Sequence, residues 1–383
     1  MISARAWRQA LWLSLVSIAF VAPQLWRVRT NIVTDTYRDA ARDVVAGTSP
    51  YGAPAPGRDV YKYSPVAALL FAPFTWLGER ACALTWLALN ALAFWLGVGC
   101  WCRISSRAPL WIFAALVATA MELDISLRYQ QVNALLTGLT LAGIAAYRDS
   151  RLGAAGILLG AASALKVLPA AFLGALLYPF RPRYLRGVLV ALALALILPL
   201  LWLGTARAIG LHTQWFHLLA ADSTAGGLLD LKSLLRVIGV SRTLATPVCL
   251  IVAGLSAFGL LATRIFRSEF LPWGAWASLG LLSLLLLSPR TESPTFVLGA
   301  PAYLLLTLNA FTERPAAKRV TLVLVAVAAF LVTVSYTDAW PKAIWSPHPY
   351  RGFPKTVGTL VLWGVSLRVL LRTWWRRRSV EQW

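Results

Sequence analysis

Three aspartates at helical spacing follow the first apolar stretch of this sequence. Asp35, Asp39 and Asp43 recur every four residues, so a helix over this segment would place them on one face. A carboxylate held beside an aqueous cavity can take a proton from a hydroxyl group and so act as a general base. Asp35 could instead cap the helix, and the other two could pair with neighbouring arginines. For any one of the three taken alone, this structural role is favoured.

The residues around the aspartates predict an amphipathic helix that ends near Gly47. Its apolar face would be formed by residues spaced at i, i+3, i+4, i+7 and i+8, namely Tyr37, Ala40, Ala41, Val44 and Val45. Gly47, followed by Ser49-Pro50, stands where such a helix would stop. A helix of this kind beside a membrane can lie in the interface and present its carboxylates to water.

The composition is that of a polytopic membrane protein. Of 383 residues, 58% are hydrophobic and 13% are charged, whereas a soluble protein carries about twice that charged fraction. The apolar runs are continuous, which excludes a water-soluble fold and the alternating pattern of a membrane β-barrel. The net charge of +21 comes mostly from Lys and Arg clusters at the ends of apolar runs, as the positive-inside rule expects. We therefore expect membrane lipids as partners and no nucleic acid.

The apolar runs predict an all-α fold of about 12 membrane segments, with both termini inside, in a single membrane domain over residues 1–383. The predicted segments lie at about 9–26, 81–101, 108–121, 130–147, 153–165, 168–180, 187–204, 244–263, 271–287, 294–311, 320–336 and 356–371. Outer loops are predicted at 27–80, 205–243 and 337–355. Within the first loop, the stretch 66–77 is too short to cross and is expected to be interfacial or re-entrant.

A lysine interrupts one apolar stretch where the chain must turn. The halves 153–165 and 168–180 lie between two basic clusters, so they are expected to form a hairpin of short helices with Lys166 at or near the turn. A charge at membrane depth costs a few kcal/mol unless it is paired or lies in a cavity. We expect Lys166 to bind a phosphate or pyrophosphate in such a cavity. A snorkelling lysine or an ion pair is the structural alternative.

Further polar residues near the predicted span ends could contact a phosphate or a sugar. Arg128 and Arg290 could add to the phosphate site, although Arg290 could equally pair with Glu292. Gln131 and Asn133 place two amides at the start of a membrane helix, available to sugar hydroxyls or to neighbouring helices. The residues expected along a sugar or acceptor path are Tyr37, Asp39, Tyr61, Tyr63, Trp215 and His217. The histidines lack metal-ligand spacing, so no metal site is expected.

An ordered series of short motifs resembles a known enzyme family. The motifs are Asp35-x-Tyr37, Ala40-Ala41, Gly47-x-x-Pro50-Tyr51, Tyr61-x-Tyr63-Ser64-Pro65, Gln131-x-Asn133, Lys166-x-x-Pro169 and Ser288-Pro289. Their order is similar to that in bacterial polyprenol-phosphate-mannose-dependent mannosyltransferases, which form glycosyltransferase family 87 and have the GT-C fold. The resemblance covers about residues 30 to 300. The sequence departs from the family pattern after Ser288-Pro289 and at Asp230-Leu231-Lys232-Ser233-Leu234.

The resemblance implies a glycosyltransferase of the cell membrane whose active site faces the outer side. It implies a polyprenyl-phosphate mannose donor, a lipid-linked or envelope glycan acceptor, an inverting transfer, and no nucleotide sugar, metal or cofactor. An aspartate of the first outer loop is the base in that family, and Asp35 matches its position. Lys166, with Arg128 or Arg290, would then hold the phosphate leaving group. A transporter or flippase of a lipid-linked sugar, or an inactive envelope-assembly scaffold, are the alternative functions.

Overall fold

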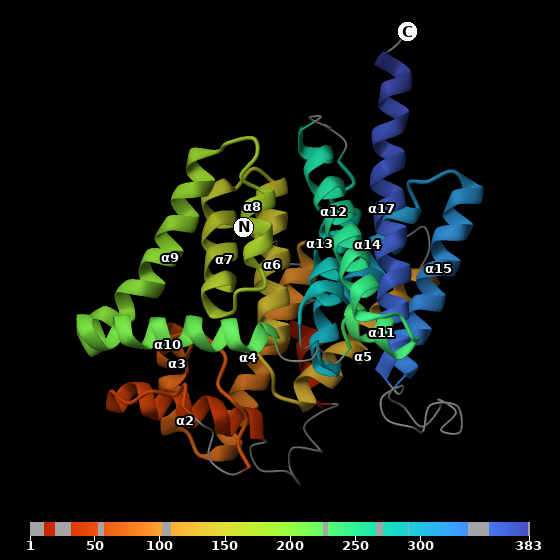
Figure 1. Ribbon diagram of the computed structural model, residues 1–383. Helices are drawn as coiled ribbons and strands as arrows, with labels where there is room; N and C mark the ends of the chain where they lie inside the picture. The colour runs from red at the N-terminus through yellow and green to blue at the C-terminus, as the bar shows by residue number, and fades with distance from the viewer. Residues whose placement is uncertain are drawn as a thin grey trace. The chain divides into compact units, whose positions relative to one another are not determined.

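The computed structural model describes the residues 11–19, 32–52, 57–101, 109–224, 229–265, 271–289, 291–335 and 352–381. These residues form α-helices and 3-10 helices joined by turns, with no strand among them, so the all-α prediction is confirmed for this part of the chain (Figure 1). By its internal contacts the chain divides into two compact units. Unit 1 holds residues 1–102, 124–173 and 181–225, and unit 2 holds residues 103–123, 174–180 and 226–383.

Unit 1 is a row of apolar helices with further helices packed against it, two of which run crosswise to the row (Figure 1). Its elements are α2 (Ile32–Ala46), α3 (Pro65–Phe71), η1 (Ala72–Trp76), α4 (Glu79–Gly99), α6 (Asn133–Arg148), α7 (Leu152–Leu165), α9 (Pro182–Leu203) and α10 (Thr205–Thr224). In the row, α4 packs on α6, α6 on α7, and α7 on α9. Helix α2 packs on α3 and η1, while α10 packs on α9 and α3. Figure 1 shows α2 and α10 running crosswise to α6, α7 and α9.

Unit 2 is organised around α13, which is buried along most of its length. Its elements are α11 (Leu231–Val237), α12 (Arg242–Ile265), α13 (Trp273–Leu287), η2 (Ser293–Leu298), α14 (Pro301–Ala310), α15 (Pro315–Val334) and α17 (Phe353–Glu381). Helices α12, α14 and α17 pack on α13, and α15 packs on α14 and α17. Two further helices, α5 (Pro109–Arg128) and α8 (Ala170–Ala175), each contain one of the points where the chain passes between the units.

Six helices among the described residues are long and apolar enough to cross a membrane, which confirms a multi-pass membrane protein. They are Glu79–Gly99, Leu110–Arg128, Pro182–Leu203, Arg242–Ala262, Pro315–Thr333 and Phe353–Trp375. The apolar helices α7 and α13 are shorter. The total of about 12 membrane segments, the single domain over 1–383 and the inside position of the termini stay predictions.

Several predicted boundaries differ from the observed helices. The segment expected to end at 121 continues as α5 to Arg128, because Glu122 and Asp124 each have a basic partner. The second half of the hairpin, expected over 168–180, is helical only over Ala170–Ala175. The segment 294–311 is broken into η2 and α14. The stretch 66–77 forms two short helical pieces, α3 and η1, and its interfacial or re-entrant position stays a prediction.

Glycines allow α7 and α9 to approach each other at the level of the backbone. A Cβ atom on Gly156 of α7 would lie 2.2 Å from the Tyr184 carbonyl oxygen, and one on Gly187 of α9 would lie 2.3 Å from the Gly153 carbonyl oxygen. Small residues of this kind are typical of helix contacts in membranes, where packing rather than the hydrophobic effect drives association. The contact fixes α7 against α9, and the C-terminal end of α7 carries Lys166.

A fully buried ion pair joins α5 and α17 in unit 2. Lys355 Nζ lies 2.8 and 2.7 Å from the two carboxylate oxygens of Glu122, and both side chains are 0% exposed. The ammonium group also lies 5.2 Å from the centroid of the Phe296 ring. Lys355 was expected at the end of the third outer loop, but α17 begins at Phe353 and therefore includes it. The preceding loop residues 336–351 lie outside the described residues.

We expect Lys355→Met to lower the free energy of unfolding in detergent by about 3–5 kcal/mol, because Glu122 would stay buried without its cation. The double variant Lys355→Met with Glu122→Gln should recover most of that loss, since it removes both charges. Thermal or denaturant unfolding of the purified protein measures these values.

Arg128→Gln is the control for this comparison. It breaks a second ion pair of α5, Arg128 to Asp124 at 2.7 Å, in which the arginine is 41% exposed. Exposed pairs of this type contribute less than about 1 kcal/mol. If Lys355→Met lowered the free energy of unfolding no more than Arg128→Gln, the buried pair would stabilise unit 2 no more than an exposed pair stabilises the protein.

Candidate functional site

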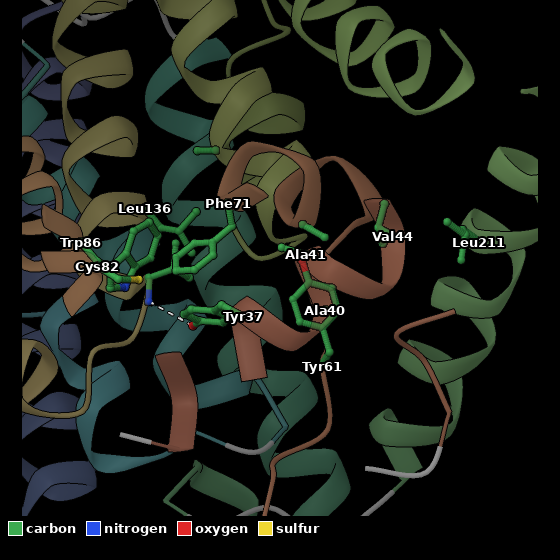
Figure 2. Packing of buried hydrophobic residues seen from close by; sticks show 13 residues of the cluster. Tyr37, Ala40, Ala41, Val44, Tyr61, Phe71, Cys82, Trp86, Leu136 and Leu211 are labelled. Carbon is green, nitrogen blue, oxygen red and sulfur yellow. Dashed lines mark hydrogen bonds between the residues drawn. The ribbon is translucent and has the colours of Figure 1, made fainter. Parts of the chain in front are cut away.

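Helix α2 buries one face and turns its aspartates to the other. The apolar residues of its buried face are each at most 5% exposed and are Tyr37, Ala40, Ala41 and Val44. Figure 2 shows Tyr37 beside Phe71 and Trp86, and Val44 toward Leu211 of α10. Val45, also expected on this face, is 44% exposed, because it lies at the edge of the helical stripe. The predicted amphipathic helix is thus confirmed apart from Val45.

Asp35 lies inside the first turn of α2 and not at its N-cap. The helix already includes Ile32, three residues earlier, so the capping alternative for Asp35 is wrong. The exposed fraction of the Asp35 side chain is 20%. An acidic residue in the first turn is favoured by the helix dipole, and it remains available for contacts with other segments.

Arg58 links two of the aspartates. Its Nη1 atom lies 2.5 Å from Asp35 Oδ2, and its Nε atom lies 3.0 Å from Asp39 Oδ2. Arg42 Nη1 contacts the other Asp39 oxygen, Oδ1, at 3.1 Å. The alternative in which the aspartates pair with neighbouring arginines is therefore confirmed for Asp39. The hydrogen bond to Asp35 is the main cause that raises the pKa of Arg58 above its usual value, so Arg58 stays charged.

Sequence reasoning missed Arg58. It lies 23 residues beyond Asp35, after a Pro/Gly-rich turn, so no helical or strand spacing relates the two positions. The available signal was weak: a basic residue near the end of an irregular stretch that precedes Tyr61. Only the folding of that stretch back onto α2 brings the opposite charges together.

Two tyrosines, Tyr37 and Tyr63, connect α2 to Lys166. The Tyr37 hydroxyl donates to the Tyr63 hydroxyl at 3.0 Å and accepts from the Val132 backbone N–H at 3.4 Å. The Lys166 ammonium lies 5.5 Å from the centroid of the Tyr63 ring. Burial raises the pKa of Tyr37 well above its usual value, so its hydroxyl keeps its proton and can donate.

Lys166 lies at the end of α7, as the hairpin prediction required. It is the C-cap residue, with an extended backbone, and its Nζ donates to Asn133 Oδ1 at 3.1 Å. Asn133, the first residue of α6, is 0% exposed and donates through Nδ2 to Gln131 Oε1. The two amides and the lysine therefore come together, although 33 residues separate Lys166 from Asn133.

An apolar cavity of about 260 Å³ lies within unit 1 beside these groups. Its lining includes Tyr37, Tyr61, Tyr63, Phe71, Phe74, Trp86 and Leu165. Several of the rings meet edge to face, for example Tyr37 with Trp86 and Phe71 with Trp86. The cavity is lined almost entirely by carbon, but Leu165 immediately precedes Lys166 in the chain. The arrangement could hold a hydrocarbon chain whose polar end lies near Lys166.

The remaining predicted residues lie in different places. Trp215 of α10 is buried and donates through Nε1 to the Lys62 carbonyl oxygen at 3.1 Å, so it contacts the segment that carries Tyr61 and Tyr63. His217 is exposed on α10. Arg128 is exposed and paired with Asp124. Arg290 lies outside the described residues.

Comparison with known proteins gives two curated relatives. The polyprenol-phosphate-mannose-dependent alpha-(1-2)-phosphatidylinositol mannoside mannosyltransferase of Mycolicibacterium smegmatis is 30% identical over 192 residues, which are 44% of this chain and 43% of that protein. GPI mannosyltransferase 1 of Aspergillus oryzae is 32% identical over 150 residues, which are 37% of this chain and 33% of that protein. The matched stretches thus span less than half of either relative. No solved structure matches the chain.

The sequence profile named Glycosyltransferase family 87 matches residues 61–289. This stretch includes Tyr61, Tyr63, Gln131, Asn133 and Lys166, and it begins after α2. The matched residues make up more than half of the chain and contain the lysine, the two amides and two of the tyrosines described above. This protein therefore belongs to glycosyltransferase family 87.

Proposed function

We propose that this protein transfers mannose from a polyprenyl-phosphate donor to a hydroxyl group of a lipid-linked or envelope glycan acceptor. The transfer takes place on the outer face of the cell membrane and inverts the anomeric carbon. The acceptor oxygen forms the new bond to that carbon while the bond to the phosphate oxygen breaks. The acceptor proton passes to Asp35, and polyprenyl phosphate leaves.

The contact of α2 with Lys166 through Tyr37 and Tyr63 is the observation that carries this proposal. A general base and a phosphate-binding cation must lie on opposite sides of the same anomeric carbon, so they must belong to one site. The hydroxyl pair at 3.0 Å joins α2 to Tyr63, whose ring lies under the Lys166 ammonium. Asp35 lies two residues before Tyr37 on α2, so the helix that holds the base contacts the residues that hold the cation.

The surroundings of Lys166 suit a phosphate bound to a hydrocarbon chain. Lys166 supplies a positive charge, and the Asn133 and Gln131 amides can orient it or donate to phosphate oxygens. A phosphate leaves without an acid catalyst when its negative charge is compensated. The neighbouring aromatic cavity would then take the first part of the polyprenyl chain.

The sugar and acceptor would lie between Lys166 and the acidic face of α2. Asp39, Tyr61, Tyr63, Trp215 and His217 are proposed to line this path, with Tyr37 beneath it. Exposed carboxylates and a histidine suit hydroxyl groups, while aromatic rings suit the apolar faces of sugars. The names of both relatives are those of mannosyltransferases, and one names a polyprenol-phosphate-mannose donor, which supports mannose as the sugar.

Membranes that contain the protein should convert labelled polyprenyl-phosphate mannose into a labelled glycan or glycolipid. Mass spectrometry of the product identifies the acceptor and the configuration of the new linkage. Membranes from cells that lack the protein provide the blank. Movement of the intact labelled donor across vesicles without a new product would contradict the proposal and favour a flippase.

Asp35→Asn should reduce the transfer rate by roughly a hundredfold to ten-thousandfold and leave donor binding largely intact. The amide has the size of the carboxylate but cannot take the acceptor proton. The rate of product formation and a separate donor-binding measurement check the two parts of this expectation.

Asp43→Asn is the matched control on the same helix. Asp43 lies two turns from Asp35 and accepts from Thr48 at the end of α2, so the rate should stay near that of the wild type. If Asp39→Asn abolished transfer while Asp35→Asn did not, Asp39 would be the base. If all three variants stayed active, the carboxylate mechanism would be wrong for this helix.

Lys166→Ala should weaken use of the donor by about 1.5–3 kcal/mol, because a charge-assisted contact with the phosphate is lost. The loss should fall mainly on kcat/KM for polyprenyl-phosphate mannose. Arg151→Ala at the other end of α7 removes an exposed positive charge and should leave kcat/KM unchanged. Normal donor kinetics in Lys166→Ala would assign the lysine to the structure of α7 and α6.

A further inference from the structure

Arg58 is held in place by the backbone on both sides of it. Gly57 has a φ of +76°, a conformation that favours glycine, and it turns the chain immediately before Arg58. On the other side, the Asp59 backbone N–H donates to Thr36 Oγ1 of α2 at 3.3 Å. Four residues after Arg58, the Lys62 carbonyl oxygen accepts from Trp215. The segment is therefore fastened to α2 and α10, which makes its arginine part of the site.

The guanidinium group of Arg58 offsets the repulsion between two carboxylates of α2. Asp35 and Asp39 are one turn apart, and like charges at this spacing repel each other. Arg58 contacts one oxygen of each carboxylate, at 2.5 and 3.0 Å. A planar guanidinium can meet two carboxylates in fixed directions, which a lysine ammonium cannot do. The contact uses Oδ2 of Asp35, so Oδ1 is the oxygen that can receive a proton.

We propose that Arg58 is a positioning residue for the transfer reaction, which orients the Asp35 carboxylate toward the acceptor hydroxyl. This inference rests on the proposed role of Asp35 as the base. Arg58 itself takes no proton and contacts no reacting atom. Asp39 is the second carboxylate that binds its guanidinium group. Arg58 therefore fixes the positions of the two carboxylates of α2 relative to each other.

Arg58→Gln should lower kcat roughly 10- to 100-fold, as expected when a catalytic group is misplaced, while KM for polyprenyl-phosphate mannose changes little. Arg58→Lys should recover part of kcat, because it keeps the charge but not the planar fork. Arg42→Gln is the matched control: it removes the same charge from the neighbouring contact with Asp39, and kcat should stay near wild type. The unfolding temperature of each variant in detergent should equal that of the wild type.

A double-mutant cycle separates this inference from the proposed function. In the Asp35→Asn background, Arg58→Gln should cause no further loss, because Arg58 acts through Asp35. An equal loss in both backgrounds would overturn the inference, as would a raised donor KM, which would place Arg58 on the donor phosphate. If Asp35→Asn abolished transfer and Arg58→Gln did not, the inference alone would fail. If Asp35→Asn stayed active, the proposed base and the inference would both fail.

Discussion

Burial of Tyr37, Ala41 and Val44 holds α2 against α3 and η1, and this contact decides where the opposite, acidic face of the helix lies. Ala40 and Ala41 on this face are small, which lets α2 approach its neighbours closely. Tyr37 in turn fixes the rotation of α2 about its axis, because its hydroxyl is bonded both to Tyr63 and to the backbone before α6. A rotation by one residue would break these bonds and move the aspartates away from Arg58.

The sequence was sufficient for features that depend on local pattern. The apolar stripe of α2 and its end near Gly47 follow from helical periodicity, and the turn at Lys166 follows from a charge and a proline that interrupt an apolar run. The start of α6 at Asn133 was expected within three residues. These are short-range signals, in which the deciding residues are neighbours along the chain.

Features that depend on pairing between distant segments could not be predicted from the sequence. The end of α5 was expected near residue 121, since carboxylates normally mark the edge of a membrane segment. The helix continues because Lys355, far along the chain, neutralises Glu122. Arg58 was missed for the same reason, because its contact with Asp35 depends on how an irregular segment folds back. Hydropathy and residue spacing describe one segment at a time, whereas each of these contacts forms between two segments that are distant in the sequence.

The buried pair of Glu122 and Lys355 has a consequence for the order of events during biosynthesis. The two residues are 233 positions apart, so the carboxylate is made long before the ammonium. At roughly 5–20 residues per second, the ribosome needs on the order of ten to fifty seconds to reach the lysine. During that interval α5 carries a costly uncompensated charge, which disfavours its deep insertion into lipid. The packing of unit 2 can therefore be completed only after α17 has been synthesised, because α17 carries Lys355, the counter-ion of Glu122.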